Sequence, residues 1–282
     1  MDLSFLRLVP SPDLAEWVEN FWFMRGEGPG AMPDGHRILP DGCMEFVFQL
    51  ADPFRERLPD GRFSLQPHLL LVGQMERRVD IEPSGSIHTV GVHFRPAGAS
   101  AFVPGTMTRF THCIEALGPA LGQDLEPLAA LLRAAATPEA QARVLEDFLR
   151  RLHLQAQDDP AMSRAAARLS ASGSLLDLET LARESGLSER QFRRRFEAAV
   201  GLRPKRFARL VRFQRVFEQR QENDARAWSE VALDCGYYDQ AHFNRDFRAF
   251  TGVRPRDLGR DADPLTAFFL SVSSKTAGAK RE

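Results

Sequence analysis

The stretch LARESGLSERQFRRRFEAAVGLRP (residues 181–204) recurs, with one extra residue, as VALDCGYYDQAHFNRDFRAFTGVRP (residues 231–255). Two copies are too few for a solenoid, so the repeat indicates a duplicated helical motif. The shared glycines and phenylalanines indicate that both copies have the same turn and the same buried face. The matching pairs are Ala182/Ala232, Gly186/Gly236, Phe192/Phe243, Arg194/Arg245, Phe196/Phe247, Gly201/Gly252, Arg203/Arg254 and Pro204/Pro255.

Each copy has the layout of a helix-turn-helix unit. In the first copy, Ser174 and Asp177 form an S-x-x-D box that is typical of a helix start. Gly186 suits the left-handed turn that follows. Ser188 then caps a second helix, with Gln191 as its capping-box partner. A short helix, a glycine turn and a longer second helix are therefore expected in each copy.

The second helix of the first copy is expected to present arginines to solvent. Phe192 and Phe196 are four residues apart and must face inward together. The side chains directed away from them are those of Arg190, Arg193 and Arg194, with Gln191 at the edge. Guanidinium groups match the O6 and N7 acceptors of guanine in the major groove, which favours DNA reading. The alternative is a solvated arginine-rich face on a helical bundle.

A linker helix is expected between the copies. The stretch from Pro204 to about Arg220 has apolar residues along one broad face, and its 17 residues would span about 25 Å as a helix. Adding the bodies of the two units gives about 34 Å between their second helices, which is one turn of B-DNA. One chain would then place both helices in successive major grooves.

Residues from about 161 to 258 resemble the paired helix-turn-helix domain of the AraC/XylS transcriptional regulators. The stretch ALDCGYYDQAHFNRDFRAFTGVRP carries the family pattern A-x-x-x-G-[FY]-x-D-x-x-x-F-x-R-x-F-[KR]-x-x-x-G-x-x-P, with Asp239 as the cap and His242 at the rim. Arg256-Asp257-Leu258 departs from the family, which usually ends in an aromatic residue followed by arginine. The resemblance implies double-stranded promoter DNA and RNA polymerase as partners. It implies as base-reading residues Arg190, Gln191, Arg193 and Arg194 in the first copy, and Gln240, Ala241, Asn244 and Arg245 in the second.

The N-terminal half differs in charge and in pattern. Residues 1–159 carry 14 Lys and Arg against 22 Asp and Glu, whereas residues 160–258 carry 19 against 13. An acidic half joined to a basic half indicates that only the second meets a polyanion. From Trp17 to Phe94, short apolar runs alternate with Gly, Pro and Asp turns, which predicts a mainly β region.

The runs RILPDGCMEFVF (37–48) and GVHFRPAGASAF (91–102) resemble the β-rich regulatory domain of one subset of the same family. In better-known members this domain is a cupin-like barrel that binds an effector or mediates dimerisation. Both roles stay open here, a small-molecule sensor and a dimerisation domain. A helix predicted from Pro138 to about Leu154, with Thr137 as N-cap, carries an apolar stripe. The stripe either covers the domain's own core or pairs with a second copy in a homodimer.

No catalytic residue, cofactor or metal is expected. Four histidines are interpreted as structural or surface residues: His36, His68, His88 and His93. The last two are five residues apart in a predicted strand, so they point to opposite faces unless Gly91 marks a bulge. Cys43 is interpreted as part of a packed strand, and GEGPG (26–30) as a turn. Two alternatives are a metal-dependent cupin enzyme fused to a DNA-binding domain and a non-specific architectural DNA binder.

The 282 residues contain no run of 18 apolar residues and no signal-peptide pattern at the start. The three cysteines are far apart and form no CxxC pair, so a cytoplasmic protein is expected. We predict an α+β protein of two domains, with the boundary at the polar break QAQDDP (155–160). The predicted parts are a β-rich, cupin-like barrel domain with trailing helices at 1–159, an all-α domain of two helix-turn-helix units joined by a linker helix at 160–260, and a tail at 261–282.

Overall fold

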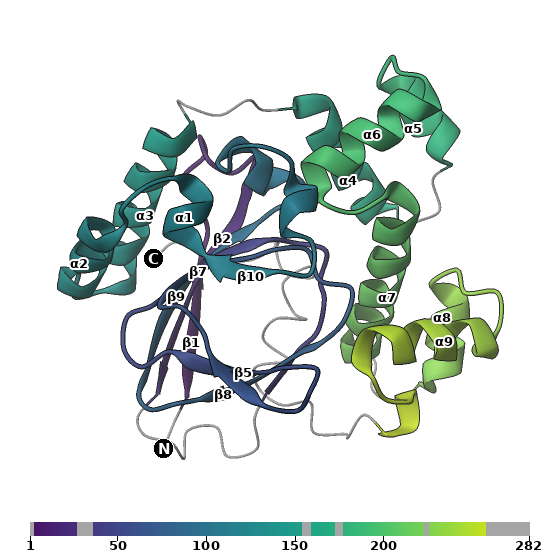
Figure 1. The fold of residues 1–282 in the computed structure, drawn as a ribbon. Coiled ribbons are helices and arrows are strands. Elements are labelled where there is room, and N and C mark those ends of the chain that lie inside the picture. The colour runs from purple at the N-terminus through teal and green to yellow at the C-terminus, as the bar shows by residue number, and fades with distance from the viewer. Residues whose placement is uncertain (1–2, 27–35, 154–158, 173–176, 223–225, 258–282) are drawn as a thin grey trace.

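The structure, a computed structural model, describes residues 3–26, 36–153, 159–172, 177–222 and 226–257 of the chain. Strands and short helices fill the first part, which we call the β region (residues 3–153). Helices fill the second part, which we call the helical region (residues 159–257), and the two lie side by side (Figure 1). The predicted α+β class is confirmed. The predicted tail, Ser174, residues 155–158 and most of the GEGPG turn lie outside the described residues.

The strands of the β region form two antiparallel sheets. The larger sheet has the order β1-β2-β9-β4-β7-β10, and the smaller has the order β3-β8-β5-β6. Among the described strands no ladder joins the two sheets, so the expected cupin-like barrel is an open pair of sheets. The bounds are β1 Ser4–Leu8, β2 Val18–Gly26, β3 His36–Ile38, β4 Glu45–Gln49, β5 Phe54–Arg57, β6 Phe63–Leu65, β7 Leu69–Val72, β8 Val79–Pro83, β9 Ile87–Phe94 and β10 Ile114–Ala116.

Strand β2 shows how the sequence builds two apolar cores. Its side chains alternate between the two faces of the larger sheet, as the period of two in a strand requires. Phe21 and Phe23 join a core that also contains the helices of the β region. Trp22 and Met24 join a second core that contains residues of both sheets. The four residues from Phe21 to Met24 are all apolar because both faces of the strand are buried there.

Three helices of the β region pack on the first of these cores: α1 (Leu117–Leu121), α2 (Glu126–Ala134) and α3 (Pro138–His153). The predicted start of α3 is confirmed, since the backbone N–H of Ala140 donates a hydrogen bond to the Thr137 hydroxyl (3.2 Å). The apolar stripe of α3 is buried within the same chain, at Leu145, Phe148, Leu149 and Leu152. The stripe therefore covers the domain's own core and is not available to a second copy.

The described helices of the helical region are α4 (Pro160–Ala171), α5 (Leu178–Glu184), α6 (Glu189–Val200), α7 (Pro204–Glu222), α8 (Trp228–Asp234) and α9 (Gln240–Thr251). Helices α5 and α6 form the first predicted unit, α8 and α9 form the second, and α7 joins them (Figure 1). Phe213 of α7 lies at the centre of the second unit's core, with its ring 5.9 Å from that of Phe247 and 4.8 Å from that of Phe250. None of the helices described is both long and apolar enough to span a membrane.

The helical region packs on the β region along α7 and at the end of α6. The Gln214 side chain of α7 donates a hydrogen bond to the carbonyl of Pro40, and Gly42 in the same loop lies against the Phe207 ring. At the end of α6, the Thr111 hydroxyl donates a hydrogen bond to the carbonyl of Gly201 (2.6 Å). The loop before β4 and the linker helix thus form one continuous contact, which we call the junction.

The second unit is also attached to the β region. The backbone N–H of Arg78 donates to the carbonyl of Phe250 (2.9 Å), and its guanidinium donates to the carbonyl of Thr251 (3.0 Å). These carbonyls belong to the last turn of α9, where helix carbonyls have no intrahelical partner. Arg206 of α7 pairs with Glu76 in the same β-region segment (2.7 Å). Both units are therefore anchored to the β region at their C-terminal ends.

Gly91 in β9 leaves room for the indole ring of Trp22. A Cβ atom at position 91 would lie 2.0 Å from that ring, which is closer than atoms pack in proteins. We expect Gly91→Ala to lower the free energy of unfolding by about 1–3 kcal/mol, as overpacking a core does. Urea unfolding followed by circular dichroism measures this change.

The double variant Trp22→Leu/Gly91→Ala is the control. Leucine lacks the ring that the new methyl group would meet, so the double variant should lose less stability than the two single variants added together. Additive losses would show that the cost at position 91 does not come from Trp22.

Candidate functional site

The first helix-turn-helix unit has the predicted turn and capping box. Gly186 has a φ of 66°, in the left-handed region. The backbone N–H of Gln191 donates to the Ser188 hydroxyl (3.4 Å), and the backbone N–H of Ser188 donates to Oε1 of Gln191 (3.1 Å). Asp177 is the N-cap residue of α5 but makes no side-chain cap hydrogen bond. The described helix therefore begins at Leu178 rather than within the predicted S-x-x-D box.

The residues predicted to read bases in α6 are all exposed: Arg190, Gln191, Arg193 and Arg194. The opposite face of the same helix holds Phe192 and Phe196, which are fully buried. Arg193 pairs with Glu189 one turn earlier. Helix α6 touches the β region at its C-terminal end, whereas the exposed residues lie in its first half. The basic face of α6 is thus directed into solvent.

The second unit repeats this arrangement. Gly236 has a φ of 85°, and the carboxylate of Asp239 caps α9 by accepting a hydrogen bond from the backbone N–H of His242 (2.6 Å). Phe243 and Phe247 are buried. The predicted base-reading residues of α9 are again all exposed: Gln240, Ala241, Asn244 and Arg245. Their contacts with DNA stay a prediction.

Sequence reasoning did not single out Tyr238. It is the extra residue in the second turn, it directly precedes the cap of α9, and its side chain is 88% exposed. Its neighbour Tyr237 is buried against Phe243. An exposed aromatic ring with a hydroxyl at the start of α9 is suited to donate a hydrogen bond to a phosphate group. Its position beside the cap was the signal that would have indicated it.

An ion pair, which we call the tether, joins the second helix of each unit to the helix that precedes the unit. In the first unit, Arg195 of α6 makes two hydrogen bonds to Asp159, the N-cap residue of α4 (2.9 and 2.7 Å). In the second unit, Asp246 of α9 pairs with Arg209 of α7 (2.7 Å). Arg195 and Asp246 occupy equivalent positions in the repeat. Both copies of the repeat therefore have this ion pair, but the basic and the acidic residue have exchanged places between the two helices.

The tether of the second unit leads to a stability prediction. Asp246 is buried while Arg209 is half exposed, so removing the carboxylate leaves a guanidinium without its main partner. We expect Asp246→Ala to lower the free energy of unfolding by about 1–3 kcal/mol, because the lost hydrogen bonds involve a charged group. DNA affinity should fall with it, because α9 loses its fixed position.

Asp234→Ala is the matched control, because Asp234 pairs with Arg226 at 2.6 Å on the exposed surface of the same unit. Its removal should change the unfolding curve little, since water screens exposed pairs. Equal effects of the two changes on thermal unfolding would contradict a structural role for Asp246.

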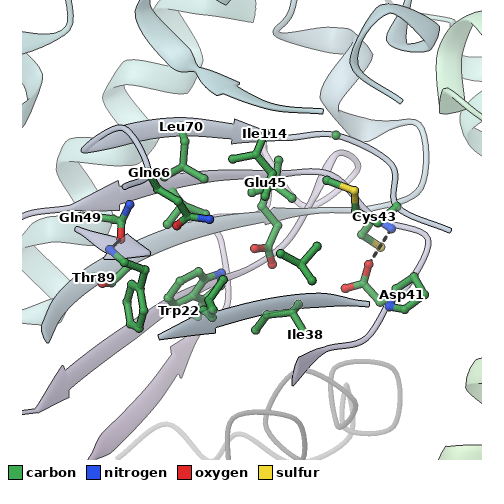
Figure 2. A pocket seen from close by; sticks show the side chains of 18 of the residues that line it. Trp22, Ile38, Asp41, Cys43, Glu45, Gln49, Gln66, Leu70, Thr89 and Ile114 are labelled. Atoms are coloured by element: carbon green, nitrogen blue, oxygen red, sulfur yellow. Dashed lines mark hydrogen bonds between the residues drawn. The ribbon is translucent and has the colours of Figure 1, made fainter. Parts of the chain in front are cut away.

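A cavity of about 90 Å³ lies between the two sheets of the β region (Figure 2). Its wall is mainly apolar and includes Trp22, Ile38, Val47, Leu70 and Ile114. Figure 2 shows the side chain of Glu45 pointing into it, with Asp41 and Cys43 at one end. A dry cavity of about 150 Å³ takes benzene, so this one suits only a small occupant unless the sheets separate.

A polar cleft of about 670 Å³ lies between the β region and helices α4 and α7. Asp41, Cys43, His93 and Arg95 line it from one side, and Arg164, Ser170, Gln214 and Glu218 are among the residues that line it from the other. Asp41 and Cys43 also line the cavity between the sheets. The loop before β4 is therefore the wall between the cavity and the cleft, and it is the same loop that forms the junction with α7.

The structure corrects the interpretation of Cys43. The residue lies in the loop before β4 rather than in a packed strand, and its side chain is half-buried. His88 and His93 point to opposite faces as predicted: His88 contacts Gln141 of α3, and His93 contacts Glu45 of β4. His93 is buried, but it takes part in a polar cluster with Asp41, Cys43 and Glu45 that sequence reasoning did not find.

The cluster shifts the ionisation of its members. Burial raises the pKa of Asp41 to about 6 and the pKa of Cys43 to about 11. Burial also acts to lower the pKa of His93, but the neighbouring Cys43, Asp41 and Glu45 outweigh it and hold that pKa well above its ordinary value. Groups with perturbed pKa values that gather beside a cleft are candidates for a functional site.

Two helix-turn-helix units joined by one helix define a class of DNA-binding domain. Residues 181–261 match a family model described as "Helix-turn-helix domain", and residues 6–114 match one described as "Domain of unknown function (DUF6597)". The HTH-type transcriptional regulator GbdR of Pseudomonas aeruginosa is 29% identical over 117 residues, which are 40% of this chain and 30% of GbdR. The HTH-type transcriptional activator RhaS of Salmonella arizonae is 33% identical over 88 residues, which are 30% of this chain and 31% of RhaS.

The helical region is thus similar to a helix-turn-helix domain and to HTH-type transcription regulators. The chain spans about a third of the length of the curated relatives it matches. Among solved structures, ToxT from Vibrio cholerae covers 95% of this chain and 97% of its own, with a TM-score of 0.46 and 8% identity. A ToxT structure described with a bound unsaturated fatty acid covers 78% of this chain and 87% of its own, with a TM-score of 0.44 and 10% identity.

Proposed function

We propose that the protein is a sequence-specific DNA-binding transcription factor that reads promoter DNA with α6 and α9. The observation that carries the proposal is the exposure of all eight predicted base-reading residues on two helices whose other faces are buried. GbdR is described as an HTH-type transcriptional regulator and RhaS as an HTH-type transcriptional activator. Promoter binding by such a factor implies contact with RNA polymerase and a place in the cytoplasm.

The length of α7 supports reading by one chain. Its 19 residues span about 28 Å at 1.5 Å per residue, and a reading helix lies beyond each end. Successive major grooves on one face of B-DNA are about 34 Å apart. The first unit offers three arginines and the second offers one, together with Gln240, Asn244 and the small Ala241. The first unit should therefore supply more of the affinity, while Ala241 can give only an apolar contact.

The β region supports control by a small molecule. Its internal cavity of about 90 Å³ has a mainly apolar wall with a few polar groups, as ligand sites usually have, and its volume suits a very small molecule. The loop of Asp41 and Cys43 separates that cavity from the cleft beside α7. A ligand that favours one position of this loop would change how the β region holds the linker helix. A homodimer, if one forms, uses a surface other than the α3 stripe.

The DNA-reading proposal predicts the effect of Arg194→Ala. Removing this guanidinium should cost about 1–3 kcal/mol of affinity for the specific site and relax the preference at one base pair. Fluorescence anisotropy with an operator found by genome-wide mapping and with its single-base variants measures both effects. Arg143→Ala is the control, because it removes the same charge from an exposed position on α3.

Arg143→Ala should leave affinity and sequence preference unchanged. If Arg194→Ala also leaves both unchanged, α6 does not read the groove through this residue. Competition with bulk DNA tests specificity separately, because a specific factor holds its site about 10³-fold or more tightly. A smaller ratio would indicate a non-specific architectural DNA binder.

The proposal that the cavity binds a small molecule predicts the effect of Val47→Phe. This change replaces a small aliphatic side chain in the cavity wall with a bulky aromatic ring. In a thermal-shift screen of the full chain against small metabolites, any compound that stabilises the wild type and changes its DNA affinity should lose both effects in this variant. Leu131→Phe, an exposed change on α2, is the control and should respond like the wild type. A compound that acts equally on Val47→Phe binds elsewhere.

A further inference from the structure

Three side chains with different metal-binding atoms meet where the β region faces the helical region. Asp41 and Cys43 come from the loop before β4, and His93 comes from the adjoining strand β9. A carboxylate oxygen, a sulfur and a ring nitrogen of these residues all lie within 4.8 Å of one another. The register that pairs Glu45 with His93 places the loop directly beside the histidine.

The Glu45 carboxylate fixes the ring of His93 in the way that the ring of a metal-binding histidine is usually fixed. Its Nδ1 lies 2.6 Å from a carboxylate oxygen of Glu45, which fixes the ring. Among the described residues no partner meets normal hydrogen-bond geometry at its Nε2, although the Cys43 side chain interacts with the ring, which is only 1% exposed. The Nε2 atom faces Asp41, whose carboxylate oxygen lies 3.6 Å away, too far for a hydrogen bond. Histidines that bind metals usually donate their other ring N–H to a carboxylate in this way.

The spacing fits a tetrahedral ion. Two ligands bound at about 2.0–2.1 Å in tetrahedral geometry are about 3.4 Å apart, close to the 3.6 Å between Asp41 and His93. One cysteine, one histidine and one carboxylate form a donor set that suits Zn²⁺ better than the all-oxygen sites of Mg²⁺ or Ca²⁺. The cleft beyond Asp41 and Cys43 leaves space for a fourth ligand, such as water.

We propose that Asp41, Cys43 and His93 bind a divalent zinc-like ion at the face between the two regions. The ion takes the thiolate of Cys43 and the neutral Nε2 of His93, and the protons displaced from both pass to solvent. The two negative ligands balance its charge. Glu45 stays on Nδ1 of His93 as the positioning residue, and Arg7 interacts with both Glu45 and Asp41.

The test measures zinc binding by the full chain without DNA, so its result is independent of the proposed DNA reading. Metal-free protein is dialysed against Zn²⁺ in the presence of a competing chelator, and bound metal is measured by mass spectrometry. We expect one ion per chain in the wild type and at least tenfold weaker binding in Cys43→Ser and in Asp41→Asn. Cys113→Ser is the control, because this second half-buried cysteine lies outside the cluster.

Binding of Co²⁺ distinguishes a metal-ligand role of Cys43 from a purely structural role. A cobalt–thiolate bond gives a charge-transfer absorption in the near ultraviolet, which should appear in the wild type and in Cys113→Ser and be absent from Cys43→Ser. Circular dichroism of each metal-free variant shows that the fold is kept. The proposal is overturned if the wild type binds no zinc, or if Cys43→Ser binds it as tightly and gives the same cobalt spectrum.

Discussion

The linker helix α7 must bury side chains against three neighbours at once, and these contacts fix where the two units and the β region lie relative to one another. Phe207 packs against Phe196 of the first unit and beside the loop of the β region, while Phe213 packs into the second unit. Gln214 adds the hydrogen bond to Pro40. A polar substitution on any of these faces would change the packing of both units, because one rigid helix joins them.

Local patterns predicted the helical region well, because its structure follows from short-range rules. The capping box at Ser188 and the cap at Asp239 join groups within three residues of each other. The spacing of four between the phenylalanines of each second helix is enough to predict which face of that helix is buried. The tethers could not be predicted in this way. Arg195 binds a residue 36 positions away, and the equivalent Asp246 carries the opposite charge, so alignment of the repeats conceals the shared role.

In the β region, even more of the structure depends on contacts between residues that are distant in the sequence, which local patterns do not predict. Alternating runs predicted strands, and the odd spacing predicted that His88 and His93 face apart. Asp41 and Cys43 lie beside His93 because strands β4 and β9 pair in a particular register. Cys43 and His93 are 50 residues apart in the sequence, so no local pattern predicts this contact. Cys43 was assigned to a strand because apolar residues follow it. The chain instead stays in a loop there, where the backbone N–H of Cys43 donates to the side chain of Asp41 (2.9 Å).

Arg78 holds the end of α9 to the β region, as Thr111 holds the end of α6. With both ends fixed, the distance and the angular offset between the two reading helices are built into the protein. Each base pair inserted between the two halves of a site rotates one half by about 35° relative to the other. In the DNA reading that we propose, this anchoring prevents the protein from following that rotation by bending α7. The sites it accepts in a genome would therefore share one helical phase, even where their base sequences differ.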